Sequence, residues 1–267
     1  MHYLYFTITG IITGFLMALF GIGGVAFIVP ALDVAFLTVP GEPHPPFQIV
    51  ILGSLAAIFI GSLPRAINTL KSSGQERLIT FILLASAIPL IAICSFIAPH
   101  IEELSLRVSF GVLISLVGIW TLLGKTSSSN IAVKTPPFSI IKVIVIGAIA
   151  GSSSAFFGLG GATLLTPLLS IWVSLPMLMC VNISLLFVAV TSFFSLLSLG
   201  YSWIHFHGTE NLTFPFATLI ILMGITAALS QSIFSKRIFK LQDSLRRKLL
   251  GSYLIGLFLW ILYKAVI

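Results

Sequence analysis

The sequence predicts an all-α polytopic membrane protein made of two inverted repeats, with about 8–10 helices in total. The first supporting observation is composition: the 267-residue chain is 58% hydrophobic and 8% charged, with a mean hydropathy of +1.15. The second is a series of apolar runs, each near the ~20 residues that cross a bilayer as a helix. The third is a glycine-rich pattern that occurs once in each half of the chain. Helices are favoured because they satisfy their own backbone hydrogen bonds in lipid, and the short alternating segments of a β-barrel are absent from the sequence.

The apolar runs define the expected elements in chain order. The first two runs, of roughly 15–20 residues each, are split at glycines within Tyr3–Val39. The runs that follow in the first half are Phe47–Leu70, Leu78–Ala98 and Val108–Leu123. Those of the second half are the split run Val143–Leu175 and then Met177–Gly200, Leu212–Phe234 and Leu249–Ile267.

Two glycine-rich segments show that the chain contains an internal repeat. The segment GFLMALFGIGGVAFIVP begins at Gly14, and GSSSAFFGLGGATLLTP begins at Gly151. When Gly14 is aligned with Gly151, further positions match at a constant offset. The matched pairs are Ala18 with Ala155, Phe20 with Phe157, Gly21 with Gly158, Gly23 with Gly160, Gly24 with Gly161, Pro30 with Pro167 and Leu32 with Leu169. A weaker match relates Gly53-Ser54-Leu55 to Ile183-Ser184-Leu185. Another relates Leu106-Arg107, followed by Gly111 and Ile114, to Arg246-Arg247, followed by Gly251 and Ile255. We therefore expect a first repeat at 1–124, a Ser-, Thr- and Pro-rich cytoplasmic linker at 125–142, and a second repeat at 143–267.

Loop charges place equivalent loops of the two repeats on opposite sides of the membrane. Loops rich in Lys and Arg face the cytoplasm. In the first repeat the loop after the second apolar element is basic, and the next loop holds Glu102 and Glu103 with only Arg107. In the second repeat the order is reversed, because Tyr201–Asn211 has no Lys or Arg and the next loop is strongly basic. The basic residues that support this orientation are Arg65, Lys71, Arg77, Lys236, Arg237, Lys240, Arg246, Arg247 and Lys248.

This inversion predicts that Val143–Leu175 begins and ends on the cytoplasmic side. Its two legs, on either side of Gly158–Gly161, have about 14–17 residues each and are somewhat short for a full crossing. We expect a re-entrant or broken helical hairpin in each repeat. A chain of eight single crossings is the alternative, which loop charges do not exclude.

The glycine breaks predict a binding site for a small anion. A break inside a membrane helix leaves N–H and C=O groups unpaired, so it survives only in protein or beside a wet cavity. The helix that restarts after the break presents free N–H groups and a positive dipole end, and glycine lets a ligand approach the backbone. The candidate substrate-binding residues are Gly21, Gly23, Gly24, Ser54, Ser152, Ser153, Ser154, Gly158, Gly160, Gly161, Asn182 and Ser184. Two alternatives stay open: the glycines allow close helix packing, and the serine run bonds helical carbonyls.

The pattern Gly-(x)6-Gly-x-Gly-Gly-(x)5-Pro, once per half, resembles that of the sulfite exporter TauE/SafE family of membrane transporters. The resemblance extends over nearly the whole chain, and includes its size and basic linker. It implies movement of small anions, notably sulfite and organosulfur compounds such as sulfoacetate, across the bacterial inner membrane. Family motifs often have a third consecutive glycine, whereas this chain has Val25 and Ala162 at those positions.

The predicted function is therefore transport of small anions by alternating access between the two repeats, without catalytic activity, cofactor, metal or nucleic-acid partner. The formal charge of +7 is explained by the basic loops. A homo-oligomer is compatible with the sequence. One alternative is a non-transporting scaffold or assembly protein. Another is an intramembrane hydrolase, which is disfavoured because no histidine lies inside an apolar run to act as a base.

Other polar residues have two interpretations each. Asp33 is either a functional intramembrane acid or a residue near the lipid headgroups. Arg65 either draws an anion inward or anchors its helix at the cytoplasmic surface. His205 and His207 either bind a metal or sense pH, or lie in a solvated outer loop.

Overall fold

The computed structural model describes residues 2–20, 25–37, 46–69, 74–123, 139–207 and 217–238, and, near the C-terminus, 251–256 with 245, 248, 249 and 259. Within these ranges all regular secondary structure is helical. The elements are α1 (His2–Phe20), α2 (Val25–Leu37), α3 (Phe47–Thr69), α4 (Gly74–Ile97), the 3-10 helix η1 (Ala98–His100), α5 (Glu103–Leu123), α6 (Ile140–Phe157), α7 (Ala162–Trp172), α8 (Met177–His207) and α9 (Ala217–Ile238).

The helices confirm the predicted fold class of an all-α, multi-pass membrane protein. Seven of the described helical segments are long and apolar enough to cross a membrane, and α2 and α7 are shorter apolar helices. Large apolar side chains on the outside, such as Phe81 and Ile141, are each 73% exposed. Such a surface suits lipid rather than water. The inverted orientation of the two repeats stays a prediction, as do their boundaries, and the linker up to residue 138 lies outside the described residues.

The hairpin of the second repeat has unequal legs, which differs from the prediction. The first leg, α6, begins at Ile140 and has 18 residues, so it qualifies as a membrane span. The second leg, α7, has only 11 residues. It ends early because Ser174 adopts a left-handed φ of 57°, and the Leu175 N–H folds back to the Leu169 carbonyl at 3.4 Å. This type of bond closes a helix C-terminus.

The prediction of a loop at Tyr201–Asn211 is partly wrong. Helix α8 continues through this region to His207 and is 31 residues long. The sequence explains the extension, because no Gly or Pro occurs between Tyr201 and His207, and the first glycine is Gly208. At 1.5 Å per residue the helix is about 46 Å long, which exceeds the hydrocarbon core of a bilayer.

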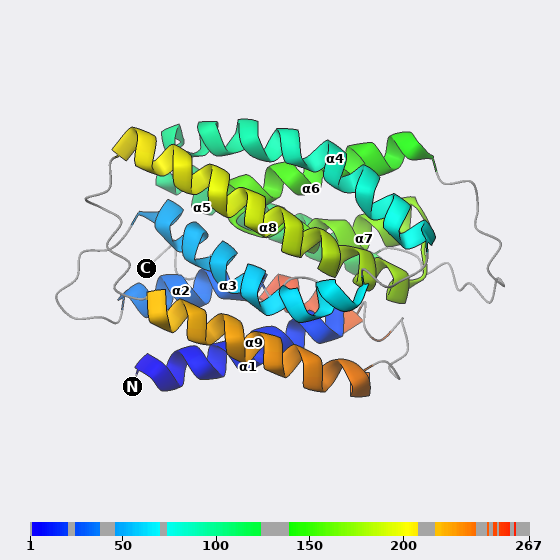
Figure 1. Cartoon of the computed structure of the whole chain (residues 1–267), viewed down its shortest axis with the longest axis horizontal. Coiled ribbons are helices and arrows are strands. Elements are labelled where there is room, and N and C mark those ends of the chain that lie inside the picture. The colour runs from blue at the N-terminus through cyan, green and yellow to red at the C-terminus, as the bar shows by residue number, and fades with distance from the viewer. Residues whose placement is uncertain are drawn as a thin grey trace.

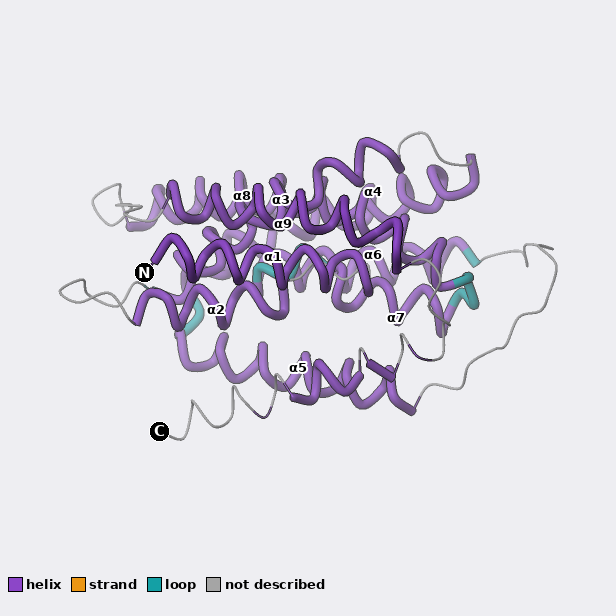
Figure 2. Tube along the Cα trace, turned by 90° about the horizontal axis from the view of Figure 1, so that it is seen from below, coloured by secondary structure: helices purple, strands orange, loops and turns teal. Residues whose placement is uncertain are grey.

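Helix contacts form two similar bundles that meet along α3 and α8 (Figures 1 and 2). In one bundle α9 packs against both α1 and α3; in the other, α4 packs against both α6 and α8. The short helices are also placed alike, since α2 packs on α3 and α7 packs on α8. Each bundle therefore combines helices from both halves of the sequence.

Close glycine contacts join α1 to α9 in the first bundle. A Cβ atom on Gly10 would lie 2.6 Å from the Met223 carbonyl oxygen, which is too close for any other residue. A Cβ atom on Gly14 would collide with the carbonyl of Ala227. This Gly-x-x-x-Gly spacing lets two helix backbones approach closely in a membrane.

The same contact occurs between α6 and α4 in the second bundle. A Cβ atom on Gly147 would lie 2.6 Å from the Leu83 carbonyl oxygen. On Gly151 it would lie 2.8 Å from the Cα, Cβ and carbonyl oxygen of Ala87. Gly14 and Gly151, which open the two matching segments in the sequence, therefore have equivalent packing roles.

This packing predicts that Gly151→Leu destabilises the protein, because the rigid backbone of α4 cannot move aside for a side chain. We expect the free energy of unfolding to fall by about 1–3 kcal/mol, measured by SDS-induced unfolding of the purified protein. Gly74→Ala is the matched control, because nothing lies within 4 Å of a Cβ atom there. Equal stability of the two variants would contradict the close contact.

Candidate anion site at the α6–α7 turn

The α6–α7 turn, residues 158–161, has a backbone that requires glycine at three of its four positions. Gly158, Gly160 and Gly161 have φ angles of 64°, 55° and 73°, in the left-handed region that other residues rarely adopt. Gly158 is the C-cap of α6: its left-handed backbone ends the helix, and its N–H donates to the Ser154 carbonyl at 3.0 Å. The fourth residue, Leu159, is fully buried.

The turn packs into the contact between α3 and α8. A Cβ atom on Gly158 would lie 2.6 Å from Ser54 Oγ on α3. A Cβ atom on Gly160 would lie 3.1 Å from Val188 on α8 and 3.6 Å from Ile58 on α3. The break in the helix is therefore surrounded by protein, as an interrupted membrane helix requires.

Two hydroxyl groups, one from each of these helices, approach carbonyls of the turn. Thr191 Oγ1 on α8 lies 2.8 Å from the Gly160 carbonyl and also 2.8 Å from the Phe187 carbonyl of its own helix, so the two carbonyls share its single proton. Ser54 Oγ lies 2.7 Å from the Ile51 carbonyl of its own helix and 3.4 Å from the Gly158 carbonyl. Both hydroxyl-bearing residues are fully buried. Two carbonyls of the turn therefore each have a hydroxyl within reach, which they share with a carbonyl of the hydroxyl's own helix.

The donor groups at the start of α7 are not occupied in the same way. Its N-cap is Gly161, which provides no side-chain cap, and the first backbone bond of the helix runs from the Leu165 N–H to the Gly161 carbonyl at 3.1 Å. The hydrogen bonds of the described residues give the Thr163 and Leu164 amides no acceptor. The Thr163 hydroxyl is also buried without a partner in the described part of the chain. This excess of donors favours a bound anion.

Some of the predicted site residues lie in this turn or next to it. Gly158, Gly160 and Gly161 form it, and Ser54 packs against it. The Ser154 hydroxyl bonds to that of Ser195 on α8 at 2.9 Å, with both residues fully buried.

The other predicted residues are placed differently. Ser184 bonds to Thr166 of α7 at 2.8 Å, whereas Asn182 is only half-buried on α8. Ser152 and Ser153 donate to the carbonyls of Ala148 and Ala150 in their own helix, at 2.9 and 2.8 Å. This is the alternative that the sequence left open for the serine run. Gly21, Gly23 and Gly24 lie outside the described residues.

Sequence reasoning missed the hydroxyls of Thr163, Thr166 and Thr191. A comparison of the two repeats does not reveal Thr163 and Thr166, because the corresponding residues in the first repeat are Ala26 and Val29. The available signal was their helical spacing: Thr163 and Thr166, three residues apart, fall on one face of α7.

The chain matches the family described as sulfite exporter TauE/SafE over residues 6–261. It belongs to this family. A protein of Xylella fastidiosa (strain Temecula1 / ATCC 700964) named "Probable membrane transporter protein" is 26% identical over 259 residues, which cover 96% of this chain and 94% of the relative. No solved structure matches the chain. This TauE/SafE protein is accordingly a multi-pass transmembrane transporter, which confirms the predicted family and membrane location and is consistent with a bacterial inner membrane.

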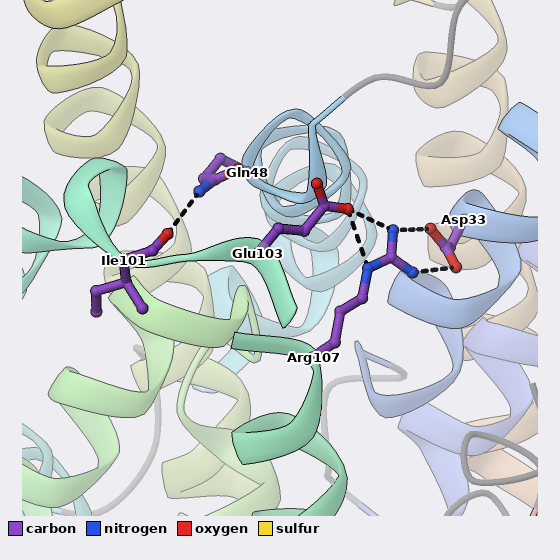
Figure 3. Close-up of polar contacts among 5 residues, drawn as sticks. All are labelled: Asp33, Gln48, Ile101, Glu103 and Arg107. Atoms are coloured by element: carbon purple, nitrogen blue, oxygen red, sulfur yellow. Dashed lines mark hydrogen bonds and ion pairs between the residues drawn. The ribbon is translucent and has the colours of Figure 1, made fainter. Parts of the chain in front are cut away.

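An ion-pair cluster connects α2 to α5 in this TauE/SafE protein (Figure 3). Arg107 binds Asp33 in bidentate fashion, with both N–O distances at 3.0 Å, and binds Glu103 at 2.8 and 3.0 Å. Its guanidinium carbon lies 4.8 Å from the centre of the Phe47 ring. The Asp33 side chain is 6% exposed and that of Glu103 is 45% exposed. Asp33 therefore has a structural partner, which neither interpretation of the sequence included.

His205 lies on helix α8 rather than in a loop. Its ring stacks on that of Tyr201, with centroids 6.2 Å apart and planes 5° apart. The described residues contain no group of three or more His, Cys, Asp or Glu side chains placed to hold a metal. The side chain of His207 lies outside the described residues.

The ion pair predicts different effects for its two acids. Asp33→Asn removes the buried charge opposite Arg107, so we expect the free energy of unfolding to fall by about 2 kcal/mol. Glu103→Gln acts on an exposed pair and is expected to cost less than about 1 kcal/mol. SDS-induced unfolding measures both, and a larger loss for Glu103→Gln would be inconsistent with the cluster.

Proposed function

We propose that this TauE/SafE protein transports small oxyanions, with sulfite and organosulfonates such as sulfoacetate as its substrates. One observation carries the proposal: in the α6–α7 turn two carbonyls have hydroxyl donors within reach, while the Thr163 and Leu164 amides and the Thr163 hydroxyl have no acceptor among the described residues. An oxyanion offers several acceptor oxygens and no obligatory donor. It is the ligand class that completes such a site.

The chemistry of the turn also suits a transported solute rather than a permanent ligand. Backbone amides and a hydroxyl are neutral donors, and the helix terminus adds only about half an elementary charge. A transport site has to bind its solute strongly enough to select it and weakly enough to release it. Neutral donors meet both needs better than a bidentate arginine.

The position of the turn between the two bundles supports alternating access. The bundle of α1, α3 and α9 and the bundle of α4, α6 and α8 meet along α3 and α8, and the turn packs against both of these helices. Rocking of one bundle against the other would expose the turn to each side of the membrane in succession. We infer that these mixed bundles, rather than residues 1–124 and 143–267, are the units that move.

The anion site predicts that Thr163→Val lowers flux without loss of folding. The change keeps the shape of the side chain and removes the unpartnered hydroxyl. The loss of one hydrogen bond to a charged solute is expected to raise the half-saturating concentration about tenfold. The measurement is uptake of sulfite, sulfoacetate, sulfate and small carboxylates into proteoliposomes.

Thr121→Val is the matched control, because Thr121 is buried in α5 and bonds only to the Val117 carbonyl of its own helix, at 2.6 Å. Equal kinetics of the two variants would remove Thr163 from the site. If the wild-type protein carried no anion under any gradient, the oxyanion proposal would fail and a scaffold role would be favoured.

The bundle proposal predicts that cross-links between bundles block transport and cross-links within a bundle do not. Two aromatic pairs are matched: Phe59 of α3 and Phe193 of α8 have centroids 5.3 Å apart, and Phe15 of α1 and Phe234 of α9 have centroids 5.2 Å apart. Each pair is changed to cysteine and joined with a short bifunctional reagent that a thiol cleaves.

The protein background for this experiment lacks the two native cysteines, Cys94 and Cys180, which are both buried. We expect cross-linked Phe59→Cys/Phe193→Cys protein to lose flux and to regain it on cleavage. Cross-linked Phe15→Cys/Phe234→Cys protein should stay active. The opposite result would mean that the bundles are not the moving units.

A further inference from the structure

A tight three-helix contact fixes the relative heights of α1, α3 and α9, which run side by side in the same direction (Figure 1). A Cβ atom on Gly61 of α3 would lie 3.3 Å from the Ala227 side chain of α9 and 3.6 Å from the sulfur of Met17 of α1. Nearer the start of the same helices, a Cβ atom on Gly53 would lie 3.0 Å from Ile220. A residue of α3 and a residue of α9 that follow Gly61 and Ala227 by the same number of positions therefore lie at the same height along the helix axes.

One turn beyond this contact α3 and α9 bring two polar side chains to one level, and a third polar group comes from the C-terminal segment. Arg65 follows Gly61 by four residues, and Gln231 follows Ala227 by four. On α1, Phe20 follows Met17 by three residues, and the ring of Tyr253 stacks on Phe20 with centroids 6.2 Å apart. We call Arg65, Gln231 and Tyr253 the polar layer.

The uncharged members of the polar layer have unsatisfied hydrogen-bonding groups. Gln231 is completely buried, and neither its amide nitrogen nor its amide oxygen has a partner in the described part of the chain. The Tyr253 hydroxyl is likewise buried without a partner there. A buried polar group without a partner destabilises the fold, so two such groups need an explanation.

The polar layer is separate from the α6–α7 turn. The turn contacts α3 as far as Ile58, and Arg65 lies seven residues further along, about 10 Å on a helix. Beyond Arg65, α3 leads to the basic residues Lys71 and Arg77, which the sequence places on the cytoplasmic side. The layer therefore lies between the turn and that side of the membrane.

We propose that Arg65, Gln231 and Tyr253 form a second oxyanion site on the cytoplasmic part of the transport pathway. This inference rests on the proposed transport of oxyanions. The guanidinium group supplies charge and several donors, while the carboxamide and the phenol supply one further donor group each. A solute that leaves the neutral donors of the turn would meet these donors about two helical turns further on. The arginine gives this second site a stronger electrostatic attraction for an anion than the turn has.

The test is Gln231→Leu, measured by sulfite flux in proteoliposomes and by melting temperature. The substitution removes buried polar atoms without partners, so the melting temperature should stay equal or rise. If Gln231 binds the anion, the half-saturating sulfite concentration should rise about tenfold. A stabilised variant with unchanged half-saturation would overturn the proposal and leave Gln231 as a hydrated packing residue.

Gln48→Leu is the matched control, because Gln48 is a buried glutamine of α3 whose side chain already has a partner, the Ile101 carbonyl at 3.5 Å (Figure 3). Its half-saturating concentration should not change. Arg65→Lys is the second variant: it keeps the charge and loses the planar donor geometry, so half-saturation should rise by a smaller factor than in Gln231→Leu. Unchanged half-saturation in Arg65→Lys would remove the arginine from the site.

The two proposals fail in different ways. If the wild-type protein transports no anion, the transport proposal fails, and the second site is then judged by sulfite-dependent stabilisation. The site predicts a rise in the melting temperature of the wild-type protein with sulfite that Gln231→Leu loses. No rise in the wild-type protein, or an equal rise in both, would overturn it.

Discussion

The central constraint in this protein is that an interrupted helix in a membrane has to satisfy its backbone groups without lipid or bulk water. At the α6–α7 turn two carbonyls have hydroxyl donors nearby, whereas amide donors are left without acceptors. Thr191 and Ser54 approach the carbonyls, whereas the first amides of α7 have no acceptor among the described residues. The glycines, their left-handed backbone and the close approach of α3 and α8 all serve to hold this arrangement in place.

Close packing of glycine against backbone then holds particular pairs of helices together. Gly10 and Gly14 hold α1 against α9, and Gly147 and Gly151 hold α6 against α4. Such contacts leave no room for sliding, since a carbonyl oxygen fills the space of a side chain. The contact between α3 and α8 is made by larger side chains such as Phe59 and Phe193, whose rings pack at a tilted angle.

The sequence predicted the elements well because hydropathy and glycine spacing are local signals. The long runs, the break after Phe157 and the glycine positions of the turn were all visible in it. The early end of α7 was not, because it depends on the left-handed backbone at Ser174. The partners of the candidate site were not visible either. Thr191 lies 31 residues from Gly160, and the bidentate pair of Asp33 and Arg107 joins residues 74 apart, so neither has a local pattern.

The two halves of the molecule share a framework but differ in their polar chemistry. In α7, Thr163 and Thr166 provide hydroxyls near the turn, and at the equivalent positions α2 has Ala26 and Val29. One turn further along, Ser170 of α7 corresponds to Asp33 of α2, which binds Arg107 of α5. In the second half, hydroxyl donors therefore lie in the short helix α7 near the turn. In the first half, the Asp33 carboxylate instead binds the short helix α2 to α5. Under the proposed function, this difference favours a solute held mainly by the α6–α7 hairpin, because Thr163 and Thr166 supply hydroxyls where Ala26 and Val29 have none.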